Sequence, residues 1–146
     1  MDPLSVLGGV AASAQLLQGL QKTAFGVIEL YRGVRDVNDS TKSLHEQLEA
    51  LQFVMFLLGN EASRIAARSP PPVEHGESMH NVLESAGRTL ARLEEIFKDI
   101  AQSRKVGAQL RQYLCARSYD VTLRDLRERL VQYVQILNIS LATLSS

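Results

Sequence analysis

Residues 44–65 read LHEQLEALQFVMFLLGNEASRI, and the spacing of the apolar side chains in this stretch decides the fold class. The regularly spaced apolar positions advance by alternating steps of four and three residues, which is typical of a helix that packs along one side. These positions are Leu44, Leu48, Leu51, Met55, Leu58, Ala62 and Ile65. Four further apolar side chains widen this side, namely Phe53, Val54, Phe56 and Leu57. We therefore expect a long helix near the centre of the fold.

Three other segments predict helices by the same reasoning. Residues 79–100 repeat the steps of four and three, and residues 3–37 and 120–144 also carry apolar side chains at helical spacing. Good helix formers dominate the composition, and no stretch alternates apolar and polar residues as a half-buried strand would. The chain is therefore expected to be all-α.

The breaks between these segments indicate how the helices connect. Polar residues 38–40 separate the first two segments, and a main loop is predicted over residues 69–76 because it contains consecutive prolines. Residues 104–119 are compatible with a short helix or with a bent continuation of the preceding one, since Gly107 weakens the pattern. Residues 1–146 are thus expected to form a single domain. Its predicted architecture is a bundle of about four long helices plus a possible short helix, mostly antiparallel because the connections are short.

The charge balance and the motifs argue against several classes of function. Lys and Arg together number 16, as do Asp and Glu, so the formal net charge is zero. A nucleic-acid-binding protein needs an excess of positive charge to displace counterions. The sequence also lacks the glycine-rich motifs that bind nucleotide phosphates. We therefore expect no catalysis, no cofactor, no nucleic acid and no small-molecule substrate.

Individual reactive side chains are explained more simply as surface or core residues. His45 lies on the flank of an exposed helix start, where a lone surface histidine is the simpler interpretation. His75 and His80 flank Glu77, but loop ligands without a second rigid pair rarely hold zinc, so no metal is expected. Cys115 is the only cysteine and cannot form an internal disulfide, which favours a small structural role and a reducing, cytoplasmic compartment.

The first predicted helix carries a line of small side chains at seven-residue intervals. This small-residue seam consists of Ser5, Ala12, Gly19, Gly26 and Gly33. One interpretation is close packing, in which another helix approaches because no side chain separates the two backbones. The other adds metastability, because each interior glycine costs roughly 0.5–1 kcal/mol of helix stability relative to alanine. Small residues also allow helices to associate in lipid.

The order of these features resembles a known family. Residues 1–58, MDPLSVLGGVAASAQLLQGLQKTAFGVIELYRGVRDVNDSTKSLHEQLEALQFVMFLL, resemble the N-terminal domain of fungal STAND proteins, which are NLR-like receptors. Residues 126–144, LRERLVQYVQILNISLATL, look like the last helix of that family. The resemblance covers nearly the whole chain and implies a HeLo-like helical bundle. The broader group is associated with membrane-targeting programmed cell death, including heterokaryon incompatibility.

The resemblance implies a signalling or effector domain that clusters and then releases its first helix toward an anionic membrane. The uncharged residues 3–21 motivate this hypothesis, although Ser and Gln interrupt them and a constitutive transmembrane helix is not expected. The membrane-facing candidates are Leu4, Val6, Leu7, Val10, Leu16, Leu17 and Leu20. The basic headgroup candidates, each worth about 1 kcal/mol near the surface, are Arg104, Lys105, Arg111 and Arg117. The alternative is a soluble adaptor or oligomerisation module that binds protein partners or itself and never contacts lipid.

Overall fold

The computed structural model describes the backbone of residues 3–34, 42–66, 73–106 and 109–145. Side chains are described for residues 15–34, 43–61, 64, 79–103 and 114–143. The described chain forms five helices and no strand, so the predicted all-α fold is confirmed. The helices are α1 (Pro3–Val34), α2 (Lys42–Ala66), α3 (Val73–Val106), α4 (Gln109–Ser118) and α5 (Asp120–Ser145).

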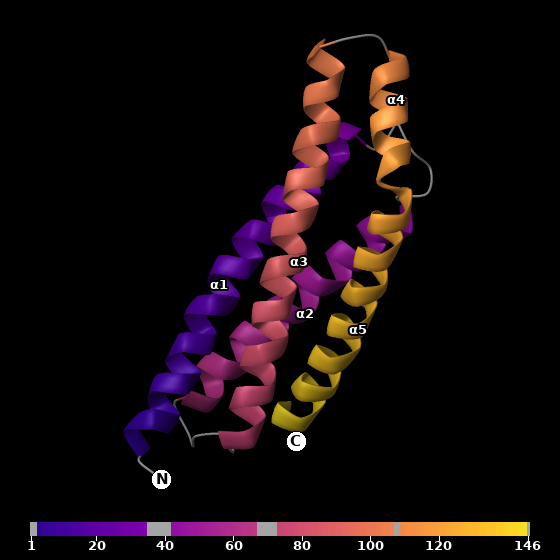
Figure 1. The fold of residues 1–146 in the computed structure, drawn as a ribbon. Coiled ribbons are helices and arrows are strands. Elements are labelled where there is room, and N and C mark those ends of the chain that lie inside the picture. Colours follow the sequence, from indigo (N-terminus) through magenta and orange to yellow (C-terminus); the bar gives the residue numbers. More distant parts are fainter. Residues whose placement is uncertain (1–2, 35–41, 67–72, 107–108, 146) are drawn as a thin grey trace.

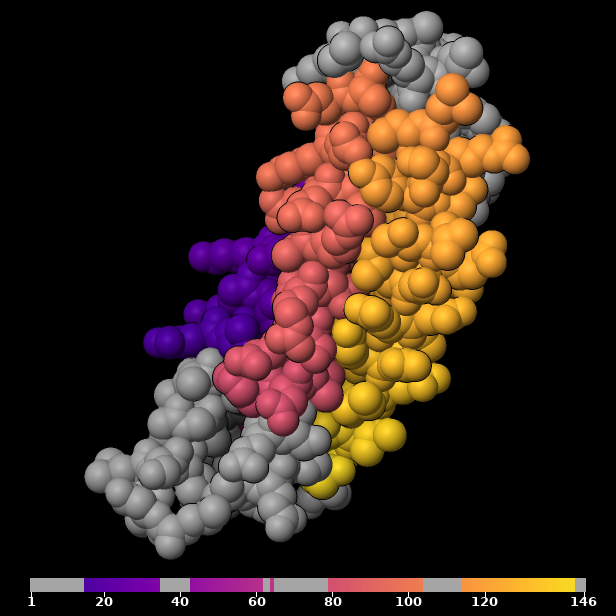
Figure 2. Space-filling model, viewed as in Figure 1, coloured from indigo at the N-terminus to yellow at the C-terminus, as the bar shows by residue number. Residues whose placement is uncertain are grey.

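The four long helices form a bundle in which each packs against two others. Successive helices run in alternate directions, while α4 and α5 run the same way on either side of the turn at Tyr119 (Figure 1). Helix α1 packs against α2 and α3, and α5 packs against the same two helices. Figure 2 shows α3 between α1 and α5 on one face of the molecule, so α2 lies on the opposite side. The pairs α1–α2 and α3–α5 are therefore antiparallel neighbours, and α1–α3 and α2–α5 are parallel ones.

An aromatic contact joins three of these helices inside the core. The Tyr31 ring of α1 stacks on His45 of α2, with ring centroids 4.9 Å apart. The same ring meets the edge of Phe97 from α3, with centroids 5.9 Å apart. Leucines at helical spacing fill the core around this contact, as the periodicity of the sequence predicts.

Polar side chains make specific contacts between the helices. Gln21 of α1 donates a hydrogen bond from Nε2 to the main-chain oxygen of Met55 in α2, over 3.1 Å. The hydroxyl groups of Thr89 in α3 and Tyr133 in α5 lie 3.0 Å apart. Arg127 of α5 donates to Oγ of Ser43 in α2 over 2.9 Å. Because a buried polar group without a partner is costly, these pairings favour one arrangement of the helices over others of similar volume.

The structure differs from the prediction around the proline loop. Helix α3 begins at Val73, so the predicted loop over residues 69–76 is too long and its last four residues are helical. Proline is compatible with the first turn of a helix, where its missing N–H group has no partner in any case, so a helix can begin directly after Pro72. At the other end of α3, the short-helix interpretation of residues 104–119 is confirmed by α4.

Helix α2 is not the central helix that its wide apolar side predicted. Val54 is buried and Leu57 is half-buried, but Phe53 and Phe56 are exposed on the outer side of the helix. Each helix of a four-membered bundle keeps one side in solvent, so no helix is surrounded. The continuous run of apolar residues therefore contains both core and surface positions.

The close-packing interpretation of the small-residue seam is wrong for its described members. A Cβ atom added at Gly19, Gly26 or Gly33 would meet no atom within 4 Å, and all three positions are exposed. The side chains of the other members, Ser5 and Ala12, lie outside the described residues. Among the described glycines, the tightest surroundings are those of Gly87 in α3, where an added Cβ atom would lie 3.1 Å from Cδ2 of Leu20 in α1.

Candidate interaction surface

The membrane-facing candidates divide into core residues and residues whose side chains are not described. Leu17 is 1% exposed and Leu20 is 6% exposed, because both lie on the side of α1 that packs in the core. Leu16 is half-buried against the same core. The remaining candidates, whose side chains lie outside the described residues, are Leu4, Val6, Leu7 and Val10. Contact of Leu17 or Leu20 with lipid would therefore require these side chains to leave the core.

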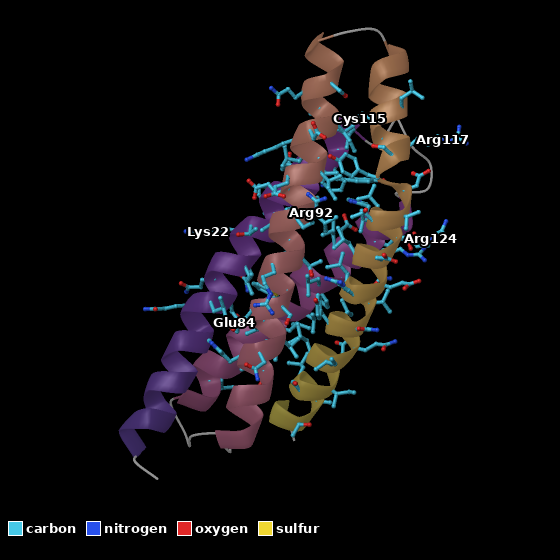
Figure 3. All side chains as sticks on the ribbon, viewed as in Figure 1. Lys22, Glu84, Arg92, Cys115, Arg117 and Arg124 are labelled. Carbon is cyan, nitrogen blue, oxygen red and sulfur yellow. The ribbon has the colours of Figure 1, made fainter. Side chains whose placement is uncertain are left out.

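The basic headgroup candidates lie on α3 and α4. Arg117 is exposed in the last turn of α4, and Figure 3 shows it on the same side of the bundle as Arg124 of α5. Arg104 and Lys105 belong to the end of α3 and Arg111 belongs to α4, but their side chains lie outside the described residues. Of the four basic candidates, Arg117 is the one whose side chain is described, and Arg124 of α5 lies on the same side of the bundle.

A polar cluster connects α3 to the junction of α4 and α5. The Tyr119 hydroxyl donates a hydrogen bond of 2.5 Å to Oδ2 of Asp99, and the Cys115 thiol lies 3.8 Å from the same oxygen. The hydrogen bond to Asp99 is the main cause that raises the pKa of Tyr119. Burial is the main cause that raises the pKa of Cys115, and the charge of Asp99 adds to it, whereas a hydrogen bond with Ser103 opposes it. A thiol with a raised pKa is a weak nucleophile at neutral pH, so the cluster connects helices and does not resemble a nucleophilic site.

His45 is not the exposed histidine that its position predicted. Its ring stacks on Tyr31, and its Nε2 lies 3.0 Å from Oε1 of Glu49, one turn further along α2. Its Nδ1 is buried without a hydrogen-bond partner. His45 does lie in the first turn of α2, as predicted, but Tyr31 of α1 covers its ring. His45 is therefore part of the packing between α1 and α2.

The histidines near the start of α3 do not form a metal site in the part of the chain that the structure describes. His80 lies 3.0 Å from Glu84, one turn away on the surface of α3. The side chains of His75 and Glu77 lie outside the described residues. Among the described residues, no group of three or more His, Cys, Asp or Glu side chains has the arrangement of a metal site.

The residues that the sequence interpretation missed are exposed phenylalanines. The chain contains four phenylalanines, of which only Phe97 is buried. Phe25 is 57% exposed, Phe53 is 63% exposed and Phe56 is 53% exposed. Aromatic side chains gain much of their stabilising energy from burial, so the exposure of three out of four leaves an unusual amount of aromatic surface in water. We call these three residues the aromatic face.

The aromatic face lies along the contact between α1 and α2. Gln21 of α1 reaches the backbone at Met55 of α2. Phe25 follows Gln21 by one helical turn on α1, and Phe56 directly follows Met55 on α2, so both lie close to this contact. A shallow groove runs beside them, lined by Gln18, Gln21, Lys22 and Phe25.

The charges around the aromatic face include both signs. Lys22 is exposed on α1 and points away from the bundle in Figure 3, and Glu46 is exposed on α2. Among the described residues neither of them forms an ion pair, whereas Glu29 pairs with Arg32 over 2.6 Å. The carboxylate nearest to the rings is that of Glu49, one turn before Phe53, and its Oε1 lies 3.0 Å from Nε2 of His45. The surface therefore combines apolar rings with the exposed Lys22 and Glu49.

The other large exposed apolar side chains of the described residues lie on α4 and α5. They are Leu114, Val121, Ile136 and Ile139. Ile136 and Ile139 are neighbours on α5, three residues apart, but they are aliphatic, and exposed aliphatic residues of this kind are normal on a protein surface. Over the described part of the chain, none of the helices has the length and apolarity needed to cross a membrane. The aromatic face is therefore the strongest candidate for an interaction surface.

Comparison with known proteins does not assign a family or a function to the chain. No family model, curated protein or solved structure matches the chain.

Proposed function

We propose that this chain is a non-catalytic helical interaction module, of the kind used in signalling and effector proteins, which binds a protein partner through its aromatic face. The observation that carries the proposal is the exposure of Phe25, Phe53 and Phe56, of which Phe25 and Phe56 lie close to the contact of Gln21 with Met55. Interfaces between proteins are enriched in aromatic residues at their centre and polar at their rim. The aromatic face has both features, since the exposed Lys22 precedes Phe25 by about one turn and the exposed Glu49 precedes Phe53 by about one turn.

The size of the aromatic face is consistent with a modest interface. A phenylalanine buries roughly 150–250 Å² when fully covered, so the exposed halves of three rings amount to about 300 Å². That is about the size of the largest apolar patch on an ordinary monomer, which is often functional. Covering it is worth about 7–8 kcal/mol before the cost of association is subtracted. The partner must therefore also contact the polar rim.

The described reactive side chains favour binding over catalysis. Cys115 has a raised pKa, and Oδ2 of Asp99, the carboxylate oxygen next to its thiol, already accepts a hydrogen bond from Tyr119. His45 is packed between helices, with its Nε2 occupied by Glu49. An acid–base or nucleophilic mechanism needs a positioned and accessible pair of groups. These residues offer structural contacts in place of such a pair.

A second candidate is the membrane effector implied by the resemblance to fungal STAND proteins. It is favoured by the run of uncharged residues at the start of α1, which continues to Lys22. Release of the whole of α1 is opposed by its core side chains, namely Leu17, Leu20, Val27, Ile28, Tyr31 and Val34. Exposing six such side chains costs roughly 9–18 kcal/mol, as much as the entire stability of a typical domain. If this function exists, we expect lipid contact from Leu4, Val6, Leu7 and Val10 while the rest of α1 stays in the bundle.

Site-specific photocrosslinking tests the interaction proposal. The photoreactive amino acid p-benzoylphenylalanine would replace Phe56 in the chain expressed in cells, with Gln135 on the exposed side of α5 as the matched control. We expect protein adducts at position 56 that are absent at position 135. Equal labelling at the two positions, with a retained fold by circular dichroism, would remove the basis of the proposal.

Liposome binding separates the two candidates. A membrane effector should sediment with anionic vesicles, and Val10→Glu should abolish this without unfolding the bundle. An interaction module that docks on a protein through its phenylalanines should stay in the supernatant when the vesicles sediment. Sedimentation that Val10→Glu abolishes would favour the membrane function.

A further inference from the structure

We infer that Ser43 is a phosphorylation site and that Arg127 receives its phosphate, which then joins α2 to α5. This inference goes beyond the proposed function and does not depend on the aromatic face. It starts from a half-buried cation. Among the described side chains, Arg127 is the one lysine or arginine that is not exposed, and within the described residues it forms no ion pair. Withdrawing a charge from water without a counter-charge is costly, so this position favours an anion.

The contact between Arg127 and Ser43 shows where that anion would lie. Nη1 of Arg127 donates a hydrogen bond to Oγ of Ser43 over 2.9 Å, which links α5 to α2. A guanidinium has five N–H donors in a planar fork, and this bond uses one of them. A phosphoryl group on Oγ would therefore stand beside a guanidinium that already contacts its bridging oxygen. Arginine–phosphate pairs are charge-assisted and often bidentate, so they are stronger than the neutral contact that they would replace.

A groove between α2 and α5 gives the phosphoryl group room. It has a volume of about 390 Å³ and is lined by Ser43 and Arg127 together with Gln47 of α2 and Gln132 of α5. This volume is far larger than the roughly 30 Å³ that one water molecule occupies. The amide groups of the two glutamines are further hydrogen-bond donors for phosphate oxygens.

The other charges near Ser43 act in both directions. Ser43 is the second residue of α2, and the helix dipole favours negative charge in the first turn. Glu128 lines the groove and Glu46 follows Ser43 by about one turn, and both would repel a phosphate. Because both carboxylates are exposed, solvent screens them. Arg127 is therefore the group that would hold the phosphate against α5.

A phosphate carried by Ser43 suits this groove better than a free anion. A free anion would be held by one cation and would bear the full cost of association, whereas a phosphate on Ser43 is tethered beside Arg127. In the modification, a protein kinase transfers the γ-phosphoryl group of a nucleoside triphosphate. The bond from phosphorus to Oγ forms, the bond to the nucleoside diphosphate breaks, and the hydroxyl proton passes to the base of the kinase. Helix ends open more readily than helix centres, which gives a kinase access to the half-buried Ser43.

A phosphorus NMR titration tests the contact with Arg127. Phosphoserine would replace Ser43 in the purified chain by genetic incorporation. The second pKa of phosphoserine is about 6, and a guanidinium in contact lowers it. Arg127→Gln should therefore raise the midpoint of the titration by at least about half a pH unit. Arg124→Gln, at an exposed position on the same helix, should leave it unchanged. Equal midpoints in the Arg127→Gln variant and the unaltered phosphoprotein would overturn the contact.

Thermal unfolding at pH 8, followed by circular dichroism, tests whether the phosphate joins the two helices. Phosphorylation should raise the melting temperature by about 4–10 °C, and in the Arg127→Gln background by less than half as much. The helix dipole acts in both backgrounds, so the difference between them measures the contribution of Arg127. An equal rise in both backgrounds would overturn the link between α2 and α5.

Two further experiments test whether Ser43 itself carries the phosphate. Inorganic phosphate at about 10 mM, with chloride at the same ionic strength as control, should leave the melting temperature of the unmodified chain unchanged. A rise that Arg127→Gln abolishes would identify a free anion as the ligand and overturn the role of Ser43. Mass spectrometry of the protein isolated from its native cells, with phosphatases inhibited, should find phosphate on Ser43. A Ser43 peptide recovered only in its unmodified form would overturn the modification site.

Discussion

Leucine substituted at two glycines should change the stability of the bundle in opposite directions. At Gly87 an added Cβ atom would lie only 3.1 Å from Cδ2 of the buried Leu20. A leucine at this position must therefore push α3 away from α1 or force Leu20 into another rotamer. At Gly26 an added Cβ atom meets nothing within 4 Å, so a leucine extends into solvent.

The expected magnitudes follow from these two environments. Both substitutions improve helix propensity by about 0.5–1 kcal/mol, because glycine is a poor helix former. Overpacking at Gly87 costs about 1–3 kcal/mol, which exceeds this gain. Gly26→Leu should thus raise the free energy of unfolding, and Gly87→Leu should lower it. Because the propensity gain is common to both, the difference of about 1–3 kcal/mol between them measures the packing at Gly87.

Thermal and urea unfolding, followed by circular dichroism, measure this difference. For a domain of this size each kcal/mol corresponds to about 3–5 °C in melting temperature, so the two variants should differ by roughly 3–15 °C. Gly26→Ala is a control that gains propensity without adding an exposed apolar side chain. If Gly26→Leu lost as much stability as Gly87→Leu, the small-residue seam would lie in a helix contact and the described packing of α1 would be incorrect.

Further predictions concern the polar contacts between helices. Asp99→Asn should lower the pKa of Tyr119, because the hydrogen bond to the Asp99 carboxylate is the main cause that raises this pKa. The absorbance titration of the tyrosinate should then move to lower pH, and a titration that does not move would contradict the contact. A group whose pKa is raised on folding stabilises the folded state at pH values below its ordinary pKa, and this stabilisation is lost as the pH rises through the folded pKa. The difference in the free energy of unfolding between the wild type and Tyr119→Phe should therefore disappear only above about pH 10. Cys115 should react with a disulfide reagent at pH 8 more slowly in the folded protein than in urea, because burial raises its pKa; equal rates would refute this. Thr89→Val and Tyr133→Phe should each cost about 0.5–1.5 kcal/mol, and the double variant should cost less than their sum if the two hydroxyl groups bond to each other.

The expected helices are observed, whereas the expected functions await the experiments described above. The resemblance to fungal STAND proteins, the membrane-facing role of Leu4, Val6, Leu7 and Val10, and the headgroup role of the basic residues stay predictions. Because Leu17 and Leu20 are buried, release of the whole of α1 toward a membrane would cost the free energy of exposing them. The aromatic face was hidden in the sequence because Phe53 and Phe56 follow one another closely within an apolar run that also contains core residues.

The sequence by itself determined the helices and most of the core. Alternating steps of four and three residues place one apolar side chain on the same side of a helix at every turn, so periodicity alone identifies buried positions such as Leu48, Leu83 and Leu130. The local chemistry of proline and glycine also located the breaks to within a few residues. These properties depend on neighbours along the chain, which a sequence displays directly.

Only the tertiary structure decided which helices meet and which apolar residues stay in water. Small side chains permit a close approach but do not attract a partner, so Gly19, Gly26 and Gly33 of α1 are exposed, while Gly87 of α3 lies against Leu20. In the same way, Phe56 and Met55 are neighbours of similar hydrophobicity, yet one is exposed and the other is buried. The reason is geometric, because adjacent residues on a helix point about 100° apart and the direction of the core depends on helices distant in the sequence.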